Sequence, residues 1–331
     1  MQAFDATVST ERLLDNGTAT RAVTADDLER ELAAVSAAAA GPSEGVFGPK
    51  SVTWMIDREA ATFLGAGRAL LLQLAHPWVA AGIAEHSRTL ADSVGRFHRT
   101  FEIVFGMVFG TLDGAQAVAR RLHRRHAVVR GSMPETVGPF PAGSSYLAND
   151  LAALTWVQAT LAETALVAHE LVRPPLPEPE RERYWAECRL FAALFGVPAR
   201  GLPADWAGFV SYNAAMHRSP VLTVSPVARE IATKLLRGGA VWLRAPSWYE
   251  AVTAHLLPEP VREGFGLRYG PAQRRIAERA IATARRLYPV LPARVRFVGP
   301  YQEAAARLAG RQPGRAVRLL NRAWIGRATL P

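Results

Sequence analysis

The amino-acid sequence predicts an all-α protein with a single large helical domain. Three observations support this fold class. Apolar residues recur at helical spacing over long stretches, Pro and Gly residues mark where these stretches begin and end, and no segment has the alternating pattern of a half-buried strand. The chain of 331 residues is long enough to bury a large core, and 49% of its residues are hydrophobic.

The predicted helices follow one another with short connections. Thr24 or Asp26 is expected to cap the first helix. The second stretch is expected to run unbroken from Trp54 to His76, because Pro77 fits the first turn of a new helix and breaks the interior of an old one. The longer predicted helices are 24–41, 54–76, 77–87, 93–109, 112–130, 149–172, 178–196 and 205–217.

The remaining segments complete the predicted domain. Residues 1–23 are polar and are expected to form an N-terminal arm, and residues 24–331 are expected to form one domain. Shorter helices separated by Pro residues are expected between 226 and 320, as an extension of the same core. Gly65 and Gly67 fall inside a helical pattern, which indicates close packing against another helix.

The net charge of +10 comes almost wholly from arginine, because Lys50 and Lys234 are the only lysines. Arginine binds carboxylate and phosphate groups in a bidentate fork. No helix, however, combines basic residues with the polar, base-reading face of a recognition helix. Nucleic-acid binding is therefore not predicted, and most arginines are interpreted as a solvated surface.

Cysteine content and apolar runs limit the remaining classes. Cys188 is the only cysteine, which excludes an intramolecular disulfide and any cluster held by several thiolates. The N-terminus lacks the pattern of a secretory signal, and the longest apolar run is interrupted by Arg68, His76 and Pro77. We therefore expect a cytoplasmic protein with no membrane span.

The most distinctive chemistry lies on the second helix of the predicted hairpin 93–130. His126 shares an apolar face with Ala119, Leu122 and Val129, so its ring is expected to point toward the core. His123 lies one turn earlier. Two histidines at this spacing cannot occupy opposite sides of one planar macrocycle, so at most one could be an axial haem ligand. A histidine on an apolar helical face is also typical of a hydrogen-bonded core residue, and that alternative stays open.

The first helix of the hairpin offers a polar face that could form the opposite wall. Arg96, Arg99 and Thr100 lie three and four residues apart, on one side of the helix. If the two helices are antiparallel neighbours, this face and the histidine face could bracket a shared pocket. Arg130 would then be placed to bind a carboxylate such as a propionate.

Several other chemistries are excluded because their motifs are missing. The chain has no Glu-x-x-His pattern for a di-iron bundle and no His-Glu-x-x-His zinc motif. It also lacks the Gly-x-Ser-x-Gly nucleophile elbow, the phosphate-binding Gly-x-x-x-x-Gly-Lys loop and a strand-bound Gly-x-Gly-x-x-Gly. Metal chemistry, if present, therefore requires histidine or a preformed cofactor.

The order of five motifs resembles one known family, over residues 47–260. The motifs are "GRALLLQLAHPWVAAGIAEHS", "GRFHRTFEIVFGMVFG", "HRRHAVVRG", "YLANDLAALTWVQATL" and "ERYWAECRLFAALFGVP". They are similar to the family formerly called domain of unknown function 2236. That family includes the catalytic domain of rubber oxygenase (latex clearing protein) and the oxygenase of the fungal mycophenolic acid pathway.

The resemblance implies an all-helical, globin-like core with additional helices that binds one haem b. It implies that His126, in "HAVVRG", is the proximal ligand of the iron. It places Arg96 and Thr100, in "RFHRT", on the distal side, and His123 and Arg130 close to the haem, at its propionates.

The sequence departs from the family pattern at two positions. Arg99 stands where the latex clearing protein has a distal lysine, and a permanently charged guanidinium cannot serve as a neutral amine ligand. Gln158 stands where many relatives have histidine, which keeps hydrogen bonding but removes an acid–base group. No carboxylate aligns securely as a general base, and Glu85 is only a nearby candidate. Activity on polyisoprene is not implied.

These observations predict a haem b-dependent oxygenase or peroxidase-like oxidoreductase. Its substrate would be an apolar or aromatic small molecule, because "FEIVFGMVFG" is rich in Phe, Met and Val. Its oxidant would be O₂ or peroxide, which haem iron activates. Arg96 or Arg99 could donate a hydrogen bond to the oxidant, and Thr100 could relay a proton. Two alternatives stay open: a non-catalytic haem or redox sensor, and a haem-free binding scaffold. Assembly as a homodimer also stays open.

Overall fold

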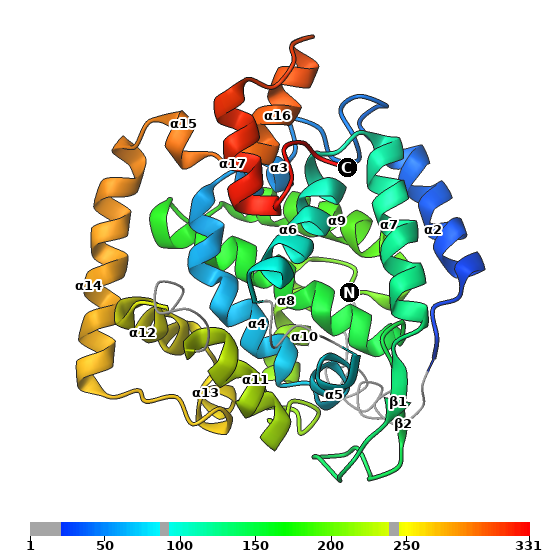
Figure 1. The fold of residues 1–331 in the computed structure, drawn as a ribbon, viewed down its shortest axis with the longest axis vertical. Coiled ribbons are helices and arrows are strands. Elements are labelled where there is room, and N and C mark those ends of the chain that lie inside the picture. The colour runs from blue at the N-terminus through cyan, green and yellow to red at the C-terminus, as the bar shows by residue number, and fades with distance from the viewer. Residues whose placement is uncertain (1–20, 87–92, 238–244) are drawn as a thin grey trace, which may run out of the picture.

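The structure, a computed structural model, describes residues 21–86, 93–237 and 245–331 (Figure 1). The side chains of residues 93, 94 and 96, inside a described helix, lie outside that description. The elements in chain order are α2 (Ala25–Ala38), α3 (Val52–Asp57), η1 (Ala60–Gly65), α4 (Ala66–Leu74), α5 (Pro77–His86), α6 (Ser93–Phe109), α7 (Leu112–Ala127), β1 (Arg130–Ser132), β2 (Ser145–Leu147), α8 (Leu151–Val172), α9 (Glu178–Ala193), η3 (Ala199–Gly201), α10 (Trp206–Arg218), α11 (Pro226–Arg237), α12 (Ser247–Leu256), α13 (Glu259–Gly264), α14 (Pro271–Leu287), η5 (Tyr288–Val290), α15 (Ala293–Arg296), α16 (Gly299–Leu308) and α17 (Arg315–Ile325).

The predicted all-α fold class is confirmed, with one small addition. β1 and β2 form an antiparallel ribbon in which Gly131 pairs with Tyr146. Three residues are too few to show an alternating pattern, which is why the sequence did not predict these strands. The ribbon also ends α7 at Ala127, three residues before the predicted end, because Arg130 enters β1.

Helix α8 lies at the centre of the molecule and organises the other helices around it (Figure 1). It packs against η1, α4, α9 and α14. Among the described helices it is the one whose length and composition would allow it to cross a membrane, yet 56% of its most apolar window is buried inside the fold. Polar side chains of α8, including Gln158 and His169, are buried as well. It is thus the central helix of the protein core.

The main apolar core draws side chains from nearly the whole described chain, from Val23 to Ile325. The predicted close packing at the two glycines is confirmed. A Cβ atom on Gly65 would lie 2.5 Å from Thr164 Cγ2 of α8, and one on Gly67 would lie 2.5 Å from Thr253 Oγ1 of α12. Three expectations stay predictions: the globin-like core, the division into one domain, and the N-terminal arm at 1–23. Residues 1–20 of that arm lie outside the described residues.

The prediction of one continuous helix from Trp54 to His76 is wrong. The chain forms α3, then η1 and α4, and Glu59 between them is extended, with φ −77° and ψ 123°. The physical reason is the burial of Glu59, whose side chain is 1% exposed and ion-paired. A break in the helix turns this carboxylate toward its partners.

Candidate cofactor and active site

His126 lies in the last turn of α7, where the structure brings three segments together. Thr111 caps the start of α7 by accepting a hydrogen bond from Gly114 N at 3.1 Å. The buried residues Val118, Ala119 and Leu122 fix the inward face of the helix. This face ends at His126, which is half-buried beside the start of α8.

Asn149 connects the two histidines of α7. It directly precedes Asp150, which caps α8 by accepting a hydrogen bond from Ala153 N at 3.0 Å. The Nδ2 atom of Asn149 donates to the carbonyl oxygen of His123 at 3.1 Å, and its side chain also hydrogen-bonds the ring of His126. This contact raises the pKa of His126, which is the direction expected when the amide oxygen Oδ1 accepts from an N–H of the ring. The other ring nitrogen of His126 keeps its lone pair.

The surroundings of His126 keep its ring neutral. Burial lowers the pKa of His126 from 6.5 to about 4, and the charges of His123 and Arg125 act in the same direction. The hydrogen bond to Asn149 raises the pKa, but by less. A neutral imidazole with one N–H already held is the form that binds a metal.

The other predicted cofactor-binding residues, His123 and Arg130, differ in their exposure to solvent. His123 is half-buried, and burial lowers its pKa. Its Nδ1 atom is buried without a hydrogen-bond partner among the described residues. Arg130 is exposed at the start of β1, and its carbonyl oxygen lies 3.0 Å from Nε2 of His86.

The ribbon and the end of α5 form the adjoining surface. Tyr146 of β2 is buried and donates a hydrogen bond to Glu85 of α5. Gly131 of β1 faces both groups: a Cβ atom there would lie 2.5 Å from Glu85 Oε2 and 2.6 Å from Tyr146 Oη. The glycine of "HAVVRG" is therefore required by this close approach.

The predicted distal residues lie on α6, antiparallel to α7. The two helices contact each other, and Arg121 of α7 pairs with Glu102 of α6 at 3.1 Å. Arg99 is half-buried and Thr100 is exposed. The side chain of Arg96 lies outside the described residues. The hairpin predicted at 93–130 is thus present, and the distal roles of the three residues stay predictions.

The donor set that the structure offers at His126 is a single imidazole. Within the described ranges, no group of three or more His, Cys, Asp or Glu side chains is placed to hold a metal. A porphyrin supplies four nitrogens of its own and needs only one axial imidazole. The single neutral ring of His126 fits that requirement.

Gln158, the second departure from the family pattern, is part of the core. It is fully buried in α8 and its Nε2 donates to the carbonyl oxygen of Cys188 in α9 at 2.9 Å. This bond ties two helices together and gives Gln158 a structural role.

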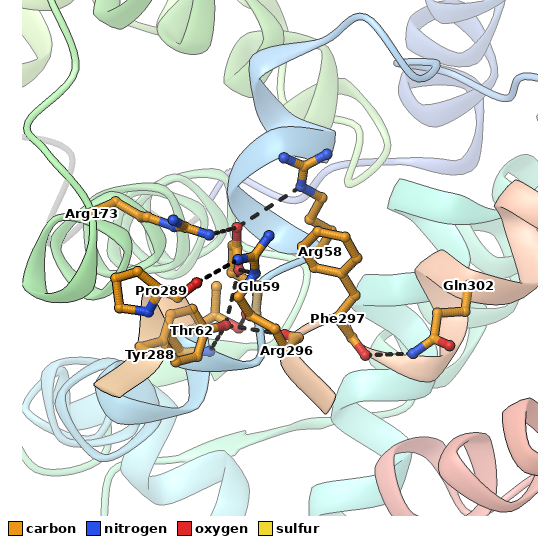
Figure 2. Close-up of polar contacts among 10 residues, drawn as sticks. Arg58, Glu59, Thr62, Arg173, Tyr288, Pro289, Arg296, Phe297 and Gln302 are labelled. Carbon is orange, nitrogen blue, oxygen red and sulfur yellow. Dashed lines mark hydrogen bonds and ion pairs between the residues drawn. The ribbon is translucent and has the colours of Figure 1, made fainter. Parts of the chain in front are cut away.

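A dense polar cluster lies elsewhere, around Glu59 (Figure 2). Arg173 pairs with its Oε1 at 3.1 Å and Arg296 with its Oε2 at 3.3 Å. Tyr288 donates to Oε2 at 3.0 Å, and Arg58 lies 4.0 Å from Oε1. Both oxygens are therefore engaged and the residue is buried, so this cluster holds η5 and α15 against the core.

Sequence reasoning missed Asn149 as a residue of the site. Two adjacent helix-capping residues, Asn149 and Asp150, stand before α8. Only one of them can cap, and the spare one is available for another contact. That redundancy is the signal in the sequence, although it does not tell which neighbour the spare side chain meets.

Comparison with known proteins identifies the relatives of this chain. Residues 53–286 match the family described as ER-bound oxygenase mpaB/B'/Rubber oxygenase, catalytic domain. No curated protein and no solved structure gave a significant match. The matched segment spans more than half of the 331 residues and runs from within α3 to within α14, including the hairpin with His126. The chain therefore belongs to the mpaB/rubber oxygenase catalytic-domain family, a family of oxygenases.

Proposed function

We propose that this protein is a haem b-dependent oxygenase or peroxidase-like oxidoreductase that acts on an apolar or aromatic small molecule. The observation that carries the proposal is His126, an imidazole that burial keeps neutral and whose ring hydrogen-bonds the side chain of Asn149. In metal sites, a ligating histidine almost always donates its second ring nitrogen to a fixed acceptor. Membership of an oxygenase family supports the same chemistry.

His126 would hold the haem on its proximal side, and its neighbours would hold the carboxylates. Bound haem supplies an iron that activates O₂ or peroxide. The exposed guanidinium of Arg130 and the unpartnered Nδ1 of His123 are suited to the propionates. Asn149 would keep the ring of His126 in one tautomer and orientation.

Three residues of α6 would act on the distal side. Arg96 or Arg99 would donate a hydrogen bond to the oxidant, and Thr100 Oγ1 would relay a proton. The guanidinium of Arg99 has N–H donors and no acceptor atom, so it would act as a donor and not as a ligand.

The apolar character of the substrate is inferred from the N-terminal half of α6. Phe105 and Phe109 belong to the buried core. Phe97 and Phe101 are half-buried one turn apart, with ring centroids separated by 4.6 Å. They share this half of the helix with Thr100, so an apolar or aromatic substrate would meet rings beside the distal polar groups.

An absorption spectrum tests the proposal directly. The full chain, expressed with a haem supplement, is expected to show a Soret band that is lost in His126→Ala and kept in His98→Ala. His98 is a matched control because it lies on the same hairpin and contacts the carbonyl oxygen of Ala323 at 3.1 Å. Colourless wild-type protein would contradict haem binding and favour a scaffold.

Turnover separates an enzyme from a sensor. The haem-loaded protein is incubated with O₂ and a reductant, or with H₂O₂, and an aromatic donor. Product formation that falls in Thr100→Val while the Soret band is kept supports catalysis with Thr100 on the distal side. A normal Soret band without turnover under both conditions would indicate a sensor.

A further inference from the structure

Exposed apolar side chains gather on one surface at the edge of the molecule. This surface, called here the α14 surface, consists of α14, η5, α15 and Trp248 of α12. Leu287, Val290 and Val295 are 56%, 77% and 64% exposed, and Trp248 is 41% exposed. Such a gathering of large exposed apolar groups marks an interaction site.

The apolar groups form a continuous strip along α14. Ile276, Ala280, Thr283 and Leu287 recur every three or four residues, so they lie on one face of the helix. The adjacent face, with Ala277 and the other core-facing residues, packs on α8 and α12. The strip therefore lies beside the buried face and is left uncovered by the described part of the chain.

Between this strip and α12 the surface is hollowed into an apolar groove of about 510 Å³. Ile276 and Trp248, on opposite sides of the groove, are both about 40% exposed, so the groove opens to solvent. Its lining residues are Leu64, Trp248, Val252, Ile276, Arg279, Ala280, Ile281, Thr283 and Ala284.

The charged residues around the apolar strip are almost all basic. Between residues 271 and 296, Glu278 is the only acidic residue. The basic residues of the same stretch are Arg274, Arg275, Arg279, Arg285, Arg286, Arg294 and Arg296.

The outward-facing arginines of α14 have no acidic partner within the described chain. Arg275, Arg279 and Arg286 are exposed along the solvent side of the strip. No carboxylate of the described residues lies within 4.0 Å of their guanidinium nitrogens. In contrast, Arg120 on α7 pairs with Glu29 at 2.7 Å. These three side chains are free to bind an external anion.

The α14 surface is remote from the candidate site at His126. Arg285 donates to the carbonyl oxygen of Leu171 near the C-terminal end of α8, whereas Asn149 marks its N-terminal end. The 22 residues of α8 correspond to a length of about 33 Å. Figure 1 accordingly places α14 and α7 at opposite edges of the molecule. The groove is thus not a place where a substrate could meet a group bound to His126.

We propose that the α14 surface docks the protein onto an anionic lipid bilayer. An amphipathic helix with apolar residues on one side and arginines beside them lies in the plane of a membrane interface. Leu287, Val290, Val295 and Trp248 enter the boundary between headgroups and acyl chains, and the outward arginines bind lipid phosphates. A folded protein partner would need a complementary acidic face, whereas an anionic bilayer supplies both the charge and the apolar phase. This inference does not depend on the proposed function.

Co-sedimentation with vesicles tests the proposal on the full chain. Binding is expected to vesicles of phosphatidylcholine with phosphatidylserine (3:1), and to be at least about tenfold weaker with phosphatidylcholine alone. The double variant Leu287→Asp/Val290→Asp and the double variant Arg279→Glu/Arg286→Glu are each expected to lower the affinity about tenfold or more. All four residues are exposed, so the fold should be kept, and circular dichroism and the Tm verify this.

Matched controls separate the α14 surface from general effects of charge and hydrophobicity. Val210→Asp removes an exposed apolar residue on α10, and Arg200→Glu/Arg218→Glu changes the net charge by the same amount elsewhere. Both controls are expected to bind vesicles like the wild type. The proposal is overturned if the controls lose binding as much as the α14 variants, or if the wild type binds neither vesicle. Self-association that disappears in Leu287→Asp/Val290→Asp, without vesicle binding, would instead identify a protein interface.

Discussion

The polar side chains at the two ends of α8 are engaged differently, by neutral hydrogen bonds at the N-terminal end and by ion pairs at the C-terminal end. At the N-terminal end, the side chain of Asn149 makes neutral hydrogen bonds to the backbone carbonyl oxygen of His123 and to the ring of His126. At the C-terminal end, Arg173 joins the cluster around Glu59, where both carboxylate oxygens are ion-paired (Figure 2). The ring of His126 at the N-terminal end can therefore bind a further group, whereas both carboxylate oxygens of Glu59 at the C-terminal end are already occupied.

This difference indicates where function resides. Tyr288 and Arg296 lie beyond residue 286, where the family match ends, yet they complete the cluster around Glu59. The charged end therefore fastens the C-terminal segment of this chain to the family core. The neutral end adjoins the hairpin that carries His126 and the motifs of the family, and the cofactor that we propose would bind there.

The largest effect on stability is expected from Glu59→Gln. The substitution leaves Arg58, Arg173 and Arg296 around a neutral group, and removing one partner of a buried ionic network costs about 3–5 kcal/mol. Urea unfolding at pH 7 measures the loss. The matched control, Glu29→Gln, breaks the exposed pair with Arg120 and should cost less than about 1 kcal/mol. Equal losses of unfolding free energy in both variants would show that the buried cluster around Glu59 stabilises the fold no more than the exposed pair of Glu29 and Arg120.

His169, near the charged end of α8, is expected to make the stability of the protein depend on pH. Burial lowers the pKa of His169 from 6.5 to about 4, helped by the charges of Arg173 and Arg58. The unfolded chain takes up a proton below pH 6.5 and the folded chain does not, so the free energy of unfolding falls from pH 6.5 to 4. The contribution of His169 to this fall is about 3 kcal/mol.

His169→Gln should remove that contribution, and unfolding curves between pH 4 and 7 measure it. Asp57 acts in the opposite sense, because its pKa is raised to about 7 by burial and by Glu187, and the stability it contributes is lost as the pH rises from 3.8 to 7. The effect of His169 is therefore taken from the difference between His169→Gln and the wild type in how the free energy of unfolding depends on pH. The same substitution at the exposed His86 is the control, and an unchanged pH slope in His169→Gln would count against the buried neutral histidine.

The C-terminal half of α8 packs tightly against η1 at Gly65. In Gly65→Ala the new methyl group would lie 2.5 Å from Thr164 Cγ2 and 3.2 Å from Ala168 Cβ. We expect a loss of about 1–3 kcal/mol in the free energy of unfolding from overpacking. Gly201→Ala, where the nearest atom lies 3.9 Å from the added Cβ, should be nearly neutral. A neutral Gly65→Ala would show that η1 can move away from α8.

The sequence was informative where neighbours in the chain decide the outcome. Thr24 caps α2 and Pro77 begins α5, as their residue types predict. The close packing at Gly65 and Gly67 was also readable, because glycine inside a helical pattern needs a reason. Local propensity and spacing are sufficient for such features.

The sequence was uninformative where distant segments meet. The break at Glu59 depends on Arg173, Tyr288 and Arg296, which lie 114 to 237 positions away along the chain. Asn149 meets His126 only because the ribbon brings the start of α8 back to the end of α7. No pattern of nearby residues carries that information, so these partners required the fold.

The smallest effect on stability, and the most specific one, is expected at Asn149. In Asn149→Leu the ring of His126 and the carbonyl oxygen of His123 each lose a hydrogen bond, at a cost of about 1 kcal/mol per bond. In Asn149→Asp the new carboxylate is placed beside the ring and favours its protonated form. NMR titration of the imidazole resonances, with His126→Ala for assignment, reports the pKa in each variant.

The two variants should move the pKa of His126 in opposite directions from about 4. The present hydrogen bond raises that pKa, so Asn149→Leu lowers it further, whereas Asn149→Asp raises it toward 6.5. If His126 binds haem as proposed, the affinity in Asn149→Leu also falls, by about 10- to 100-fold, because the ring loses its fixed orientation. An unchanged pKa in both variants would mean that Asn149 does not control the ring. The neutral end of α8 would then be only a helix cap, and the contrast with Glu59 would lose its functional meaning.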